Sequence, residues 1–266
     1  MVIHWSTKLI VGMAYVMLGR TELLDDMYIS GNFSVDQIKC DQSALAESNR
    51  LLEIFDNSQK EQKDKRDGLW KISYLNVRSM KSADGHREDV RHDNLLMDAD
   101  IFGLGETWLE KDDKVDFKDY CGYYANFGSG KGVAGYTRIN LISPPKRIAS
   151  ETYSAVFLRT NEFIIIFVYL SHNYKKKELF QLLDTWIQEN VPTALIGDIN
   201  ENIGQPFYKK MMSKGFEHLI NVPTCETGSI IDNIFVNNAM KAKNVSTNVD
   251  ATYYSDHDIV SLYIPK

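Results

Sequence analysis

The stretch Pro192-Thr193-Ala194-Leu195-Ile196-Gly197-Asp198-Ile199-Asn200 decides how the rest of the sequence is interpreted. Its apolar run, residues 194–196, has the length of a buried strand and breaks at Gly197. Side chains two residues apart on a strand share a face, so Asp198 and Asn200 are expected side by side at the strand's end. Taken alone, this pattern is more often a strand followed by a turn, because Asp and Asn are common turn residues. The other strand ends of the chain favour a site for chemistry.

Composition indicates an ordinary globular protein with an acidic balance. The chain has 266 residues, of which 44% are hydrophobic, and its 30 Lys and Arg against 36 Asp and Glu give a net charge of −6. A protein that coats duplex DNA is usually basic, so that class is disfavoured. An enzyme acting on nucleic acid is still compatible, since it needs only a local basic track and often needs carboxylates for a metal.

Cysteine usage and the absence of a targeting pattern predict an intracellular protein. Cys40, Cys121 and Cys225 are odd in number and far apart, which suits a reducing compartment. The apolar residues 9–18 are shorter than the roughly 20 needed to span a bilayer, and no small-x-small cleavage site follows them. Neither secretion nor membrane association is expected.

The first residues resemble part of a different protein class. Residues 12–20, Gly-Met-Ala-Tyr-Val-Met-Leu-Gly-Arg, resemble the late "YVALSR" motif of RecD-like helicases. Arg20 matches the arginine that reaches the γ-phosphate of ATP in that family, while Gly19 replaces its serine. The sequence has no Gly-x-x-x-x-Gly-Lys-Ser/Thr loop, so we expect a helicase C-terminus without its motor and no use of ATP. The alternative is a hydrophobic strand that packs on the domain behind it.

Domain organisation follows from one strongly polar stretch. Residues 57–68 are almost wholly polar and predict a solvated linker. They separate an N-terminal extension, residues 1–56, from a domain at 69–266. Within the extension, residues 41–55 have a partly periodic apolar face that predicts a helix.

Strands and helices interleave in the second domain, which predicts an α/β fold with sheets at its core. The pattern predicts strands at residues 69–76, 101–104, 132–139, 155–159, 162–169, 194–196, 230–236 and 259–264. It predicts helices at 88–97, 176–189 and 206–214. The two strands on either side of Thr160-Asn161 are expected to form a hairpin.

Polar residues mark four more strand ends. Asn76 ends one predicted strand and Glu106 follows another, while Asp256 and His257 precede the last one. Asp232 lies inside an otherwise apolar strand, where an unpaired carboxylate costs on the order of 3 kcal/mol. It therefore needs a partner, and we expect that partner to be His257.

Five motifs follow one another along the chain: Leu75-Asn76-Val77, Gly105-Glu106-Thr107, Gly197-Asp198-Ile199-Asn200, Ile231-Asp232-Asn233-Ile234-Phe235 and Ser255-Asp256-His257. In this order they resemble the endonuclease/exonuclease/phosphatase superfamily. The resemblance covers residues 69–266. It implies a DNase I-like, two-layered β-sandwich flanked by helices, with the strand ends meeting in one cleft.

The resemblance also implies a magnesium site, at which Mn²⁺ can substitute. Glu106 would be the principal ligand, with Asp256 and Asn76 nearby, because hard cations prefer oxygen ligands. Asp198 would activate the attacking water, and Asn200 would hold the water or the phosphate. The ordinary aspartate pKa of about 3.9 would keep Asp198 ionised at neutral pH.

Three further roles concern the phosphate. Asp232 would orient His257 and raise its pKa, so that the imidazolium stabilises negative charge on the reacting phosphate. Tyr169 would contact the scissile phosphate. Further substrate contacts are expected from Arg78, Thr224 and Ser255.

Departures from the family pattern bear on the substrate. Arg78 replaces a metal-binding aspartate of AP endonucleases, and Gly105 replaces a glutamine. Residues 76–79, Asn-Val-Arg-Ser, and the Pro-Thr pair ending at Thr224 resemble endonucleases of non-long-terminal-repeat retrotransposons. These features predict an endonuclease that nicks DNA to leave a 3′-hydroxyl, within a mobile-element protein found in the nucleus or wherever the element's DNA is accessed. The lysines at 175–177 would contact phosphates.

Two alternatives stay open at this point. The same fold could hydrolyse a phosphoinositide, another lipid or RNA, which the net acidity slightly favours. The domain could also be a catalytically inactive binding module, although the joint presence of Glu106, Asp198, Asp232 and His257 argues against that.

Overall fold

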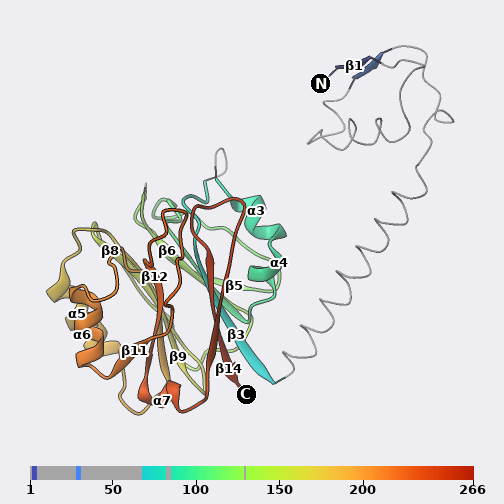
Figure 1. Ribbon diagram of the computed structural model, residues 1–266. Helices are drawn as coiled ribbons and strands as arrows, with labels where there is room; N and C mark the ends of the chain where they lie inside the picture. Colours follow the sequence, from blue (N-terminus) through green and yellow to red (C-terminus); the bar gives the residue numbers. More distant parts are fainter. Residues whose placement is uncertain (1, 5–27, 31–67, 82–84, 129) are drawn as a thin grey trace. The chain divides into compact units, whose positions relative to one another are not determined.

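The computed structural model describes residues 2–4, 28–30, 68–81, 85–128 and 130–266 (Figure 1). The chain divides into two compact units, Met1–Asp67 and Gly68–Lys266. In the first unit, β1 (Val2–His4) pairs in parallel with β2 (Tyr28–Ser30). The helicase-like stretch, the helix predicted at 41–55 and all but the last residue of the predicted linker lie outside the described residues, so these remain predictions.

The second unit contains two six-stranded mixed sheets. Sheet I consists, in spatial order, of β13 (Ser246–Asp250), β14 (Ile259–Pro265), β3 (Leu69–Asn76), β4 (Ile101–Gly105), β6 (Val133–Thr137) and β5 (Cys121–Ala125). Sheet II consists of β11 (Phe216–His218), β12 (Asp232–Asn237), β10 (Thr193–Asp198), β9 (Ile164–Leu170), β8 (Tyr153–Arg159) and β7 (Lys146–Ala149).

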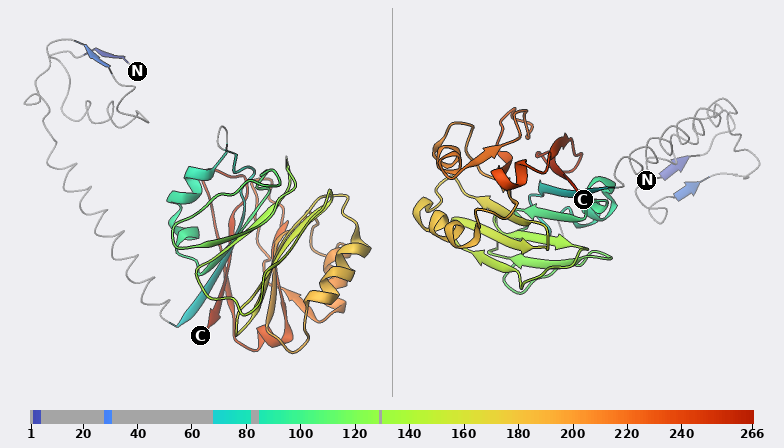
Figure 2. Two further views of the ribbon diagram at one scale, coloured as in Figure 1. Left: turned by 180° about the vertical axis from the view of Figure 1, so that it is seen from behind. Right: turned by 90° about the horizontal axis from the view of Figure 1, so that it is seen from below.

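Helices cover the outer faces of both sheets, as the two views of Figure 2 show. The helices are α3 (Arg87–His92), α4 (Asn94–Met97), α5 (Lys176–Trp186), α6 (Pro206–Ser213) and α7 (Asn238–Lys241). Apolar side chains of α3 and α4 pack on sheet I, and those of α5 and α6 pack on sheet II. A third apolar cluster fills the space between the sheets. No helix among the described residues is long and apolar enough to cross a membrane.

Glycines in β4 allow aromatic rings to lie between the sheets. Alternate residues of a strand face opposite sides, so Gly103 and Gly105 both face sheet II. A Cβ at Gly103 would lie 2.4 Å from the ring of Phe167, and one at Gly105 would lie 1.9 Å from the hydroxyl of Tyr74. These two rings stack with a centroid separation of 6.2 Å. The sequence Ile-Phe-Gly-Leu-Gly thus accommodates two rings, one from the adjacent strand β3 and one from β9 of the opposite sheet.

The predicted two-layered sandwich with flanking helices is confirmed. The predicted hairpin is present, with β8 and β9 antiparallel and a turn whose backbone hydrogen bonds to the Thr160 hydroxyl. The single helix predicted at 88–97 is wrong, because Asp93 has an extended backbone and interrupts it. Its carboxylate accepts hydrogen bonds from the backbone of Leu95 and Leu96 and begins α4 as an N-cap.

In the second unit, four of the described strands were not predicted from the sequence, namely β5, β7, β11 and β13. Each lies at an edge of its sheet. Edge strands are short and carry polar side chains, which weakens the alternation by which strands are identified.

One buried side chain connects the ends of β10 and β12 at the edge remote from Asp198. Asn237 Oδ1 accepts hydrogen bonds from the backbone N–H groups of Thr193 (3.0 Å) and Met240 (2.9 Å), and its Nδ2 donates to Val191 O (2.8 Å). Asn237→Ala should lower the free energy of unfolding by roughly 2–3 kcal/mol, because it removes a helix cap and leaves buried polar groups without hydrogen-bond partners. Urea denaturation measures the change.

Asn238→Ala is the matched control, since Asn238 is the exposed neighbour on the same turn. It should change the stability by less than about 0.5 kcal/mol. Equal losses in the two variants would contradict the capping role of Asn237.

Candidate active site

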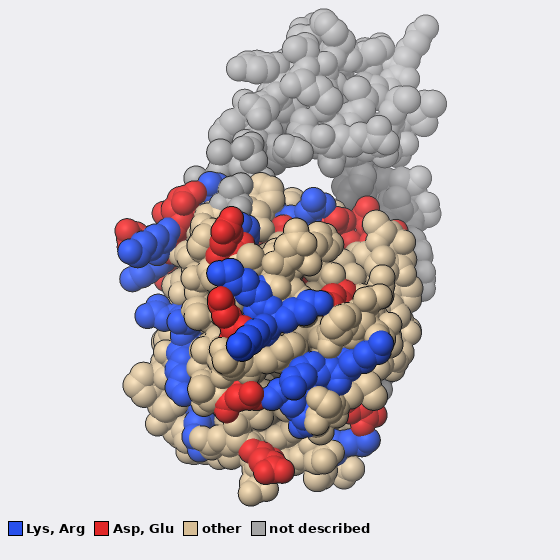
Figure 3. Space-filling model, turned by 90° about the vertical axis from the view of Figure 1, so that its left-hand side faces the viewer, with Lys and Arg blue, Asp and Glu red and all other residues tan. Residues whose placement is uncertain are grey.

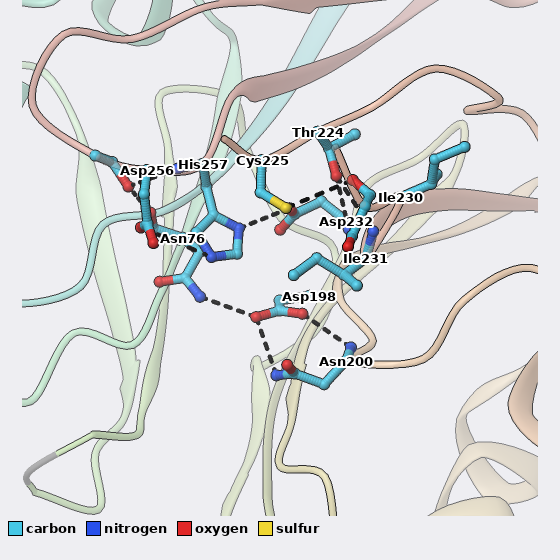
Figure 4. Close-up of polar contacts among 12 residues, drawn as sticks. Asn76, Asp198, Asn200, Thr224, Cys225, Ile230, Ile231, Asp232, Asp256 and His257 are labelled. Atoms are coloured by element: carbon cyan, nitrogen blue, oxygen red, sulfur yellow. Dashed lines mark hydrogen bonds and ion pairs between the residues drawn. The ribbon is translucent and has the colours of Figure 1, made fainter. Parts of the chain in front are cut away.

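Strand register brings the predicted site residues to one edge of the sandwich. In sheet II, Asp198 of β10 pairs with Tyr169 of β9 on one side and with Asp232 of β12 on the other. In sheet I, Asn76 ends β3 beside Gly105 at the end of β4, so Glu106 follows at the same edge. The loop before β14 brings Asp256 and His257 to this edge as well (Figure 4).

A single amide joins the acids of the two sheets. Asn76 is completely buried, and its Nδ2 donates to Glu106 Oε1 (3.2 Å) and to Asp198 Oδ2 (2.9 Å). Both carboxylates therefore lie within hydrogen-bonding distance of one nitrogen. Residues from separate parts of the chain converge here, as the sequence motifs predicted.

Asp198 and Asn200 meet through a turn, which corrects the expectation that they share a strand face. β10 ends at Asp198, and Asn200 has a left-handed backbone with φ of 50°. Asp198 Oδ1 accepts from the Asn200 backbone N–H (2.9 Å), and Oδ2 accepts from Asn200 Nδ2 (3.1 Å). The Asn200 amide also donates to Leu170 O at 2.8 Å. Asn tolerates this conformation better than most residues, which explains its position here.

The expected ordinary pKa of Asp198 is wrong. Its side chain is 1% exposed, and burial raises its pKa well above the ordinary value. The negative charge of Asp232 raises it further, while the His257 charge and the hydrogen bonds from Asn200 and Asn76 act in the opposite direction. A carboxylate with a raised pKa is a stronger base, which is compatible with the predicted role of activating a water molecule.

Asp232 and His257 form the predicted buried pair. His257 Nδ1 lies 2.7 Å from Asp232 Oδ2, and the carboxylate is completely buried. Burial by itself lowers the pKa of His257, but the hydrogen bond and charge of Asp232, with the charges of Asp198 and Asp256, outweigh it and raise the pKa to about 9. The imidazole is therefore a cation at neutral pH.

Two of the predicted metal ligands, Asp256 and Asn76, differ in which atoms they leave available to a cation. Asp256 Oδ2 forms an ion pair with Arg78 Nη1 at 2.5 Å, while Asp256 Oδ1 is buried without a hydrogen-bond partner. Asn76 turns its nitrogen toward Glu106 and Asp198, and its oxygen accepts from the Arg78 backbone N–H at 3.2 Å. The ligand role predicted for Asn76 disagrees with this orientation, which suits it to position carboxylates.

Two residues predicted as substrate contacts hydrogen bond to the backbone around the site. Thr224 is completely buried, and its hydroxyl accepts from the backbone N–H groups of Ile231 (3.3 Å) and Asp232 (3.1 Å). Ser255 donates to Asn76 O (2.7 Å) and accepts from the backbone N–H of His257 (3.2 Å). Both hydroxyls are therefore used within the protein, where they fix the backbone that carries Asp232 and His257.

Tyr169 and Trp108 complete the surroundings of Glu106. Burial raises the pKa of the Tyr169 hydroxyl, and the charges of Glu106 and Asp198 raise it further, so this group stays a neutral donor. Trp108 Nε1 donates to Glu106 Oε2 at 3.3 Å. Trp108 was not among the site residues predicted from the sequence, although it follows Glu106 by two residues.

Residues 74–257 match the model of the endonuclease/exonuclease/phosphatase family. The chain belongs to this family. Its members are hydrolases, among them nucleases and phosphatases, and the family is generally dependent on a divalent metal. Among curated proteins no match was found.

Solved structures show the same fold at low sequence identity. An AP endonuclease from Archaeoglobus fulgidus has 17% identity and a TM-score of 0.57, covering 73% of this chain and 98% of the other. The endonuclease domain of TRAS1, a telomere-specific non-LTR retrotransposon, has 16% identity and a TM-score of 0.56, covering 74% and 98%. The 3′ phosphatase NExo from Neisseria, bound to a product DNA hairpin, has 19% identity and a TM-score of 0.55, covering 74% and 100%.

The residues at this edge fit a hard divalent cation. Asp232 Oδ1 is a buried oxygen without a hydrogen-bond partner, and Asp256 Oδ1 has only a 3.9 Å ion pair with His257 Nε2. Such atoms are costly unless something binds them. Ligand atoms of Asp198, Asp232 and His257 also lie within 4.8 Å of one another. His257 uses Nδ1 for Asp232 and is protonated, so carboxylate oxygens are the better ligands here.

Replacement of His257 should make the stability of the metal-free protein less dependent on pH. The folded pKa of about 9 lies above the unfolded value of 6.5, so the protonated pair stabilises fully below pH 6.5 and loses its effect as the pH rises through 9. The difference in unfolding free energy between wild type and His257→Gln should therefore be largest at pH 6 and shrink by at most about 3 kcal/mol by pH 10. Urea denaturation in EDTA measures it.

His172→Gln is the control, because His172 is exposed. Its difference from wild type should stay below about 0.5 kcal/mol at every pH. A His257→Gln difference that is constant from pH 6 to pH 10 would contradict the charged pair.

Proposed function

We propose that this chain is a Mg²⁺-dependent endonuclease that nicks DNA and leaves a 3′-hydroxyl. We also propose that it acts as part of a mobile-element protein, in the nucleus or wherever the element's DNA is accessed. The sequence motifs at residues 76–79 and 222–224, which resemble those of retrotransposon endonucleases, support this assignment. A fold shared with a retrotransposon endonuclease domain supports it as well.

The proposal depends most on the two hydrogen bonds that the Asn76 amide donates to Glu106 and Asp198. It brings an acid from each sheet together beside the charged pair of Asp232 and His257. A base and a cation at one edge are what phosphodiester hydrolysis requires, because water must lose a proton while negative charge builds up on the phosphate.

Each side chain has a distinct part in the hydrolysis. Asp198 accepts a proton from the attacking water, whose oxygen bonds to phosphorus as the bond to the 3′ oxygen breaks. Asn200 holds Asp198 in orientation through two hydrogen bonds. Protonated His257 donates a hydrogen bond to a non-bridging phosphate oxygen and keeps its proton. The 3′ oxygen leaves and takes a proton from solvent water to become the hydroxyl.

Glu106 and Asp256 would hold the Mg²⁺, with water and phosphate oxygens as the remaining ligands. The bound ion supplies positive charge that offsets the charge developing on the phosphate and the leaving oxygen. Arg78 pairs with Asp256 and is about half exposed, so its guanidinium can turn to a DNA phosphate.

Local charge supports a nucleic-acid substrate despite the net acidity. Lys and Arg side chains gather on the face that carries α5 and α6 (Figure 3). Exposed lysines at these helices and at β7 are Lys146, Lys175, Lys176, Lys177, Lys209 and Lys210. Residues 175–177 are the N-cap and first residues of α5, shortly after β9 ends at the active-site edge. A DNA strand leaving the site can therefore reach them.

The direct test is a plasmid assay. Supercoiled plasmid with Mg²⁺ should be converted to nicked circles, and Asp198→Asn or Glu106→Gln should lower the rate by at least about a hundredfold, because each removes a carboxylate from the site. Agarose electrophoresis measures the nicking, and extension of the nick by a polymerase reports the 3′-hydroxyl.

Asp184→Asn and Glu110→Gln are matched controls, since both acids are exposed and lie outside the site. Both should retain activity. Failure of the wild type to nick with either Mg²⁺ or Mn²⁺ would refute the proposal, and release of inorganic phosphate from small phosphoesters alone would instead assign a phosphatase.

Neutralising residues 175–177 should weaken DNA binding and its dependence on salt. Replacing the three lysines with Gln should reduce the slope of log K against log salt by about 2–3, since each lost phosphate contact removes about one unit. Binding to a fluorescent duplex between 50 and 200 mM salt measures the slope. The variant Lys241→Gln/Lys243→Gln, altered near the opposite edge, should keep the wild-type slope; equal slopes in all three proteins would contradict this DNA path.

A further inference from the structure

The backbone on both sides of Thr107 has a conformation that favours glycine. Glu106 and Trp108 have φ angles of 46° and 56°, in the left-handed region. Side chains with a Cβ are disfavoured there, and a bulky side chain is a marked exception. Non-glycine residues in such conformations cluster at functional sites, where the surrounding structure holds them in place. The indole at position 108 therefore stands where backbone geometry alone would select a smaller residue.

Hydrogen bonds to two neighbouring loops hold this backbone. Thr107 N–H donates to Gly132 O at 3.3 Å, and Trp108 N–H donates to Lys131 O at 2.9 Å. On the other side, Thr107 O accepts from Met80 N–H at 2.8 Å. The segment that carries Glu106 is thus fixed to the β5–β6 loop and to the loop after β3, and it keeps its unusual conformation.

The indole of Trp108 donates to the carboxylate that this segment carries. Trp108 Nε1 lies 3.3 Å from Glu106 Oε2, while Glu106 Oε1 accepts from Asn76 Nδ2 at 3.2 Å. One N–H on each oxygen restricts the rotation of the carboxylate. Each carboxylate oxygen has two acceptor positions, so both oxygens can still bind a cation.

We propose that Trp108 is a positioning residue for the metal, whose indole N–H holds the Glu106 carboxylate in the orientation that binds Mg²⁺. The N–H withdraws some negative charge from the carboxylate. Its ordering effect is larger, because a free glutamate side chain must give up much rotamer freedom to bind an ion. The inference deepens the proposed function and rests on Glu106 as a ligand of the cation.

Trp108→Phe keeps an aromatic ring and removes the N–H donor. The Kd for Mn²⁺ should rise about tenfold, the lower end of what the loss of a hydrogen bond to a metal ligand costs. The EPR signal of free Mn²⁺ measures this affinity without DNA and without any assay of activity. The Tm of the metal-free protein should fall by less than about 4 °C, because the ring is retained.

Trp70→Phe is the matched control. Trp70 is likewise half-buried, and its Nε1 donates to Glu162 Oε1 at 3.2 Å. It lies near the start of β3, at the end remote from Asn76. This variant loses the same kind of hydrogen bond away from the site and should keep the wild-type Kd for Mn²⁺. Equal affinities in the wild type and in both variants would overturn the inference.

Glu106→Gln shows whether the measured ion binds at this acid. It should raise the Kd for Mn²⁺ more than Trp108→Phe does, because it removes a charged ligand. An unchanged affinity in Glu106→Gln would place the ion elsewhere and overturn the positioning of Glu106 by Trp108.

Metal concentration separates positioning from a general loss of structure. At limiting Mg²⁺, Trp108→Phe should nick plasmid about tenfold more slowly than the wild type, in proportion to its weaker affinity for the ion. Saturating Mg²⁺ should restore the wild-type kcat, with KM for DNA unchanged. A loss of rate that saturating Mg²⁺ leaves in place would contradict the positioning role.

The outcomes distinguish this inference from the proposed function. If the wild type binds Mn²⁺ but fails to nick DNA, the endonuclease proposal fails, and the Mn²⁺ affinities still decide the role of Trp108. A wild type that nicks DNA while Trp108→Phe keeps its full affinity for Mn²⁺ would overturn the inference and leave the endonuclease proposal intact. Absence of Mn²⁺ binding by the wild type would overturn the inference as well.

Discussion

The site depends on the two N–H bonds of one buried amide. Face-packed sheets lie about 10 Å apart, so acids from opposite sheets meet only where a side chain reaches across the open edge. Asn76 does this by donating to Glu106 on one side and to Asp198 on the other. A neutral donor suits the task, because it links two anions and cancels the charge of neither. The negative charge therefore remains available to a cation and to a water proton.

Gathering acids in this way opposes folding. Asp198 and Asp232 are 1% and 0% exposed, and an ionised carboxylate without partners at such depth costs several kcal/mol. Asp198 is compensated by hydrogen bonds from Asn76 and Asn200, and Asp232 by His257. Three apolar clusters supply the remaining stability, because both faces of each sheet are covered. The same packing holds the strand ends rigid, so the acids cannot relax apart.

Much of this arrangement could be predicted from the sequence, and the limits are physical. Buried central strands such as β10 are identified by their apolar runs, and the motifs at the ends of such strands locate Glu106, Asp198 and His257. Edge strands such as β7, whose residues are exposed or half-buried, leave no such run. The interruption at Asp93 depends on a cap, which competes locally with a helical pattern that otherwise continues. The raised pKa of Asp198 follows from burial among distant residues, which no local pattern records.

Departures from a family pattern have to be judged in three dimensions. Glycine at position 105 looks like the loss of a contact when the motif Gly-Glu-Thr is considered along the chain. In the folded sheet, the same glycine leaves the space that the Tyr74 hydroxyl occupies, because a Cβ at position 105 would overlap that hydroxyl. Residues 74 and 105 belong to adjacent strands of sheet I and to separate motifs. The side chains that line a site therefore depend on the motif of one strand and also on the side chains of the adjacent strand that occupy the same space.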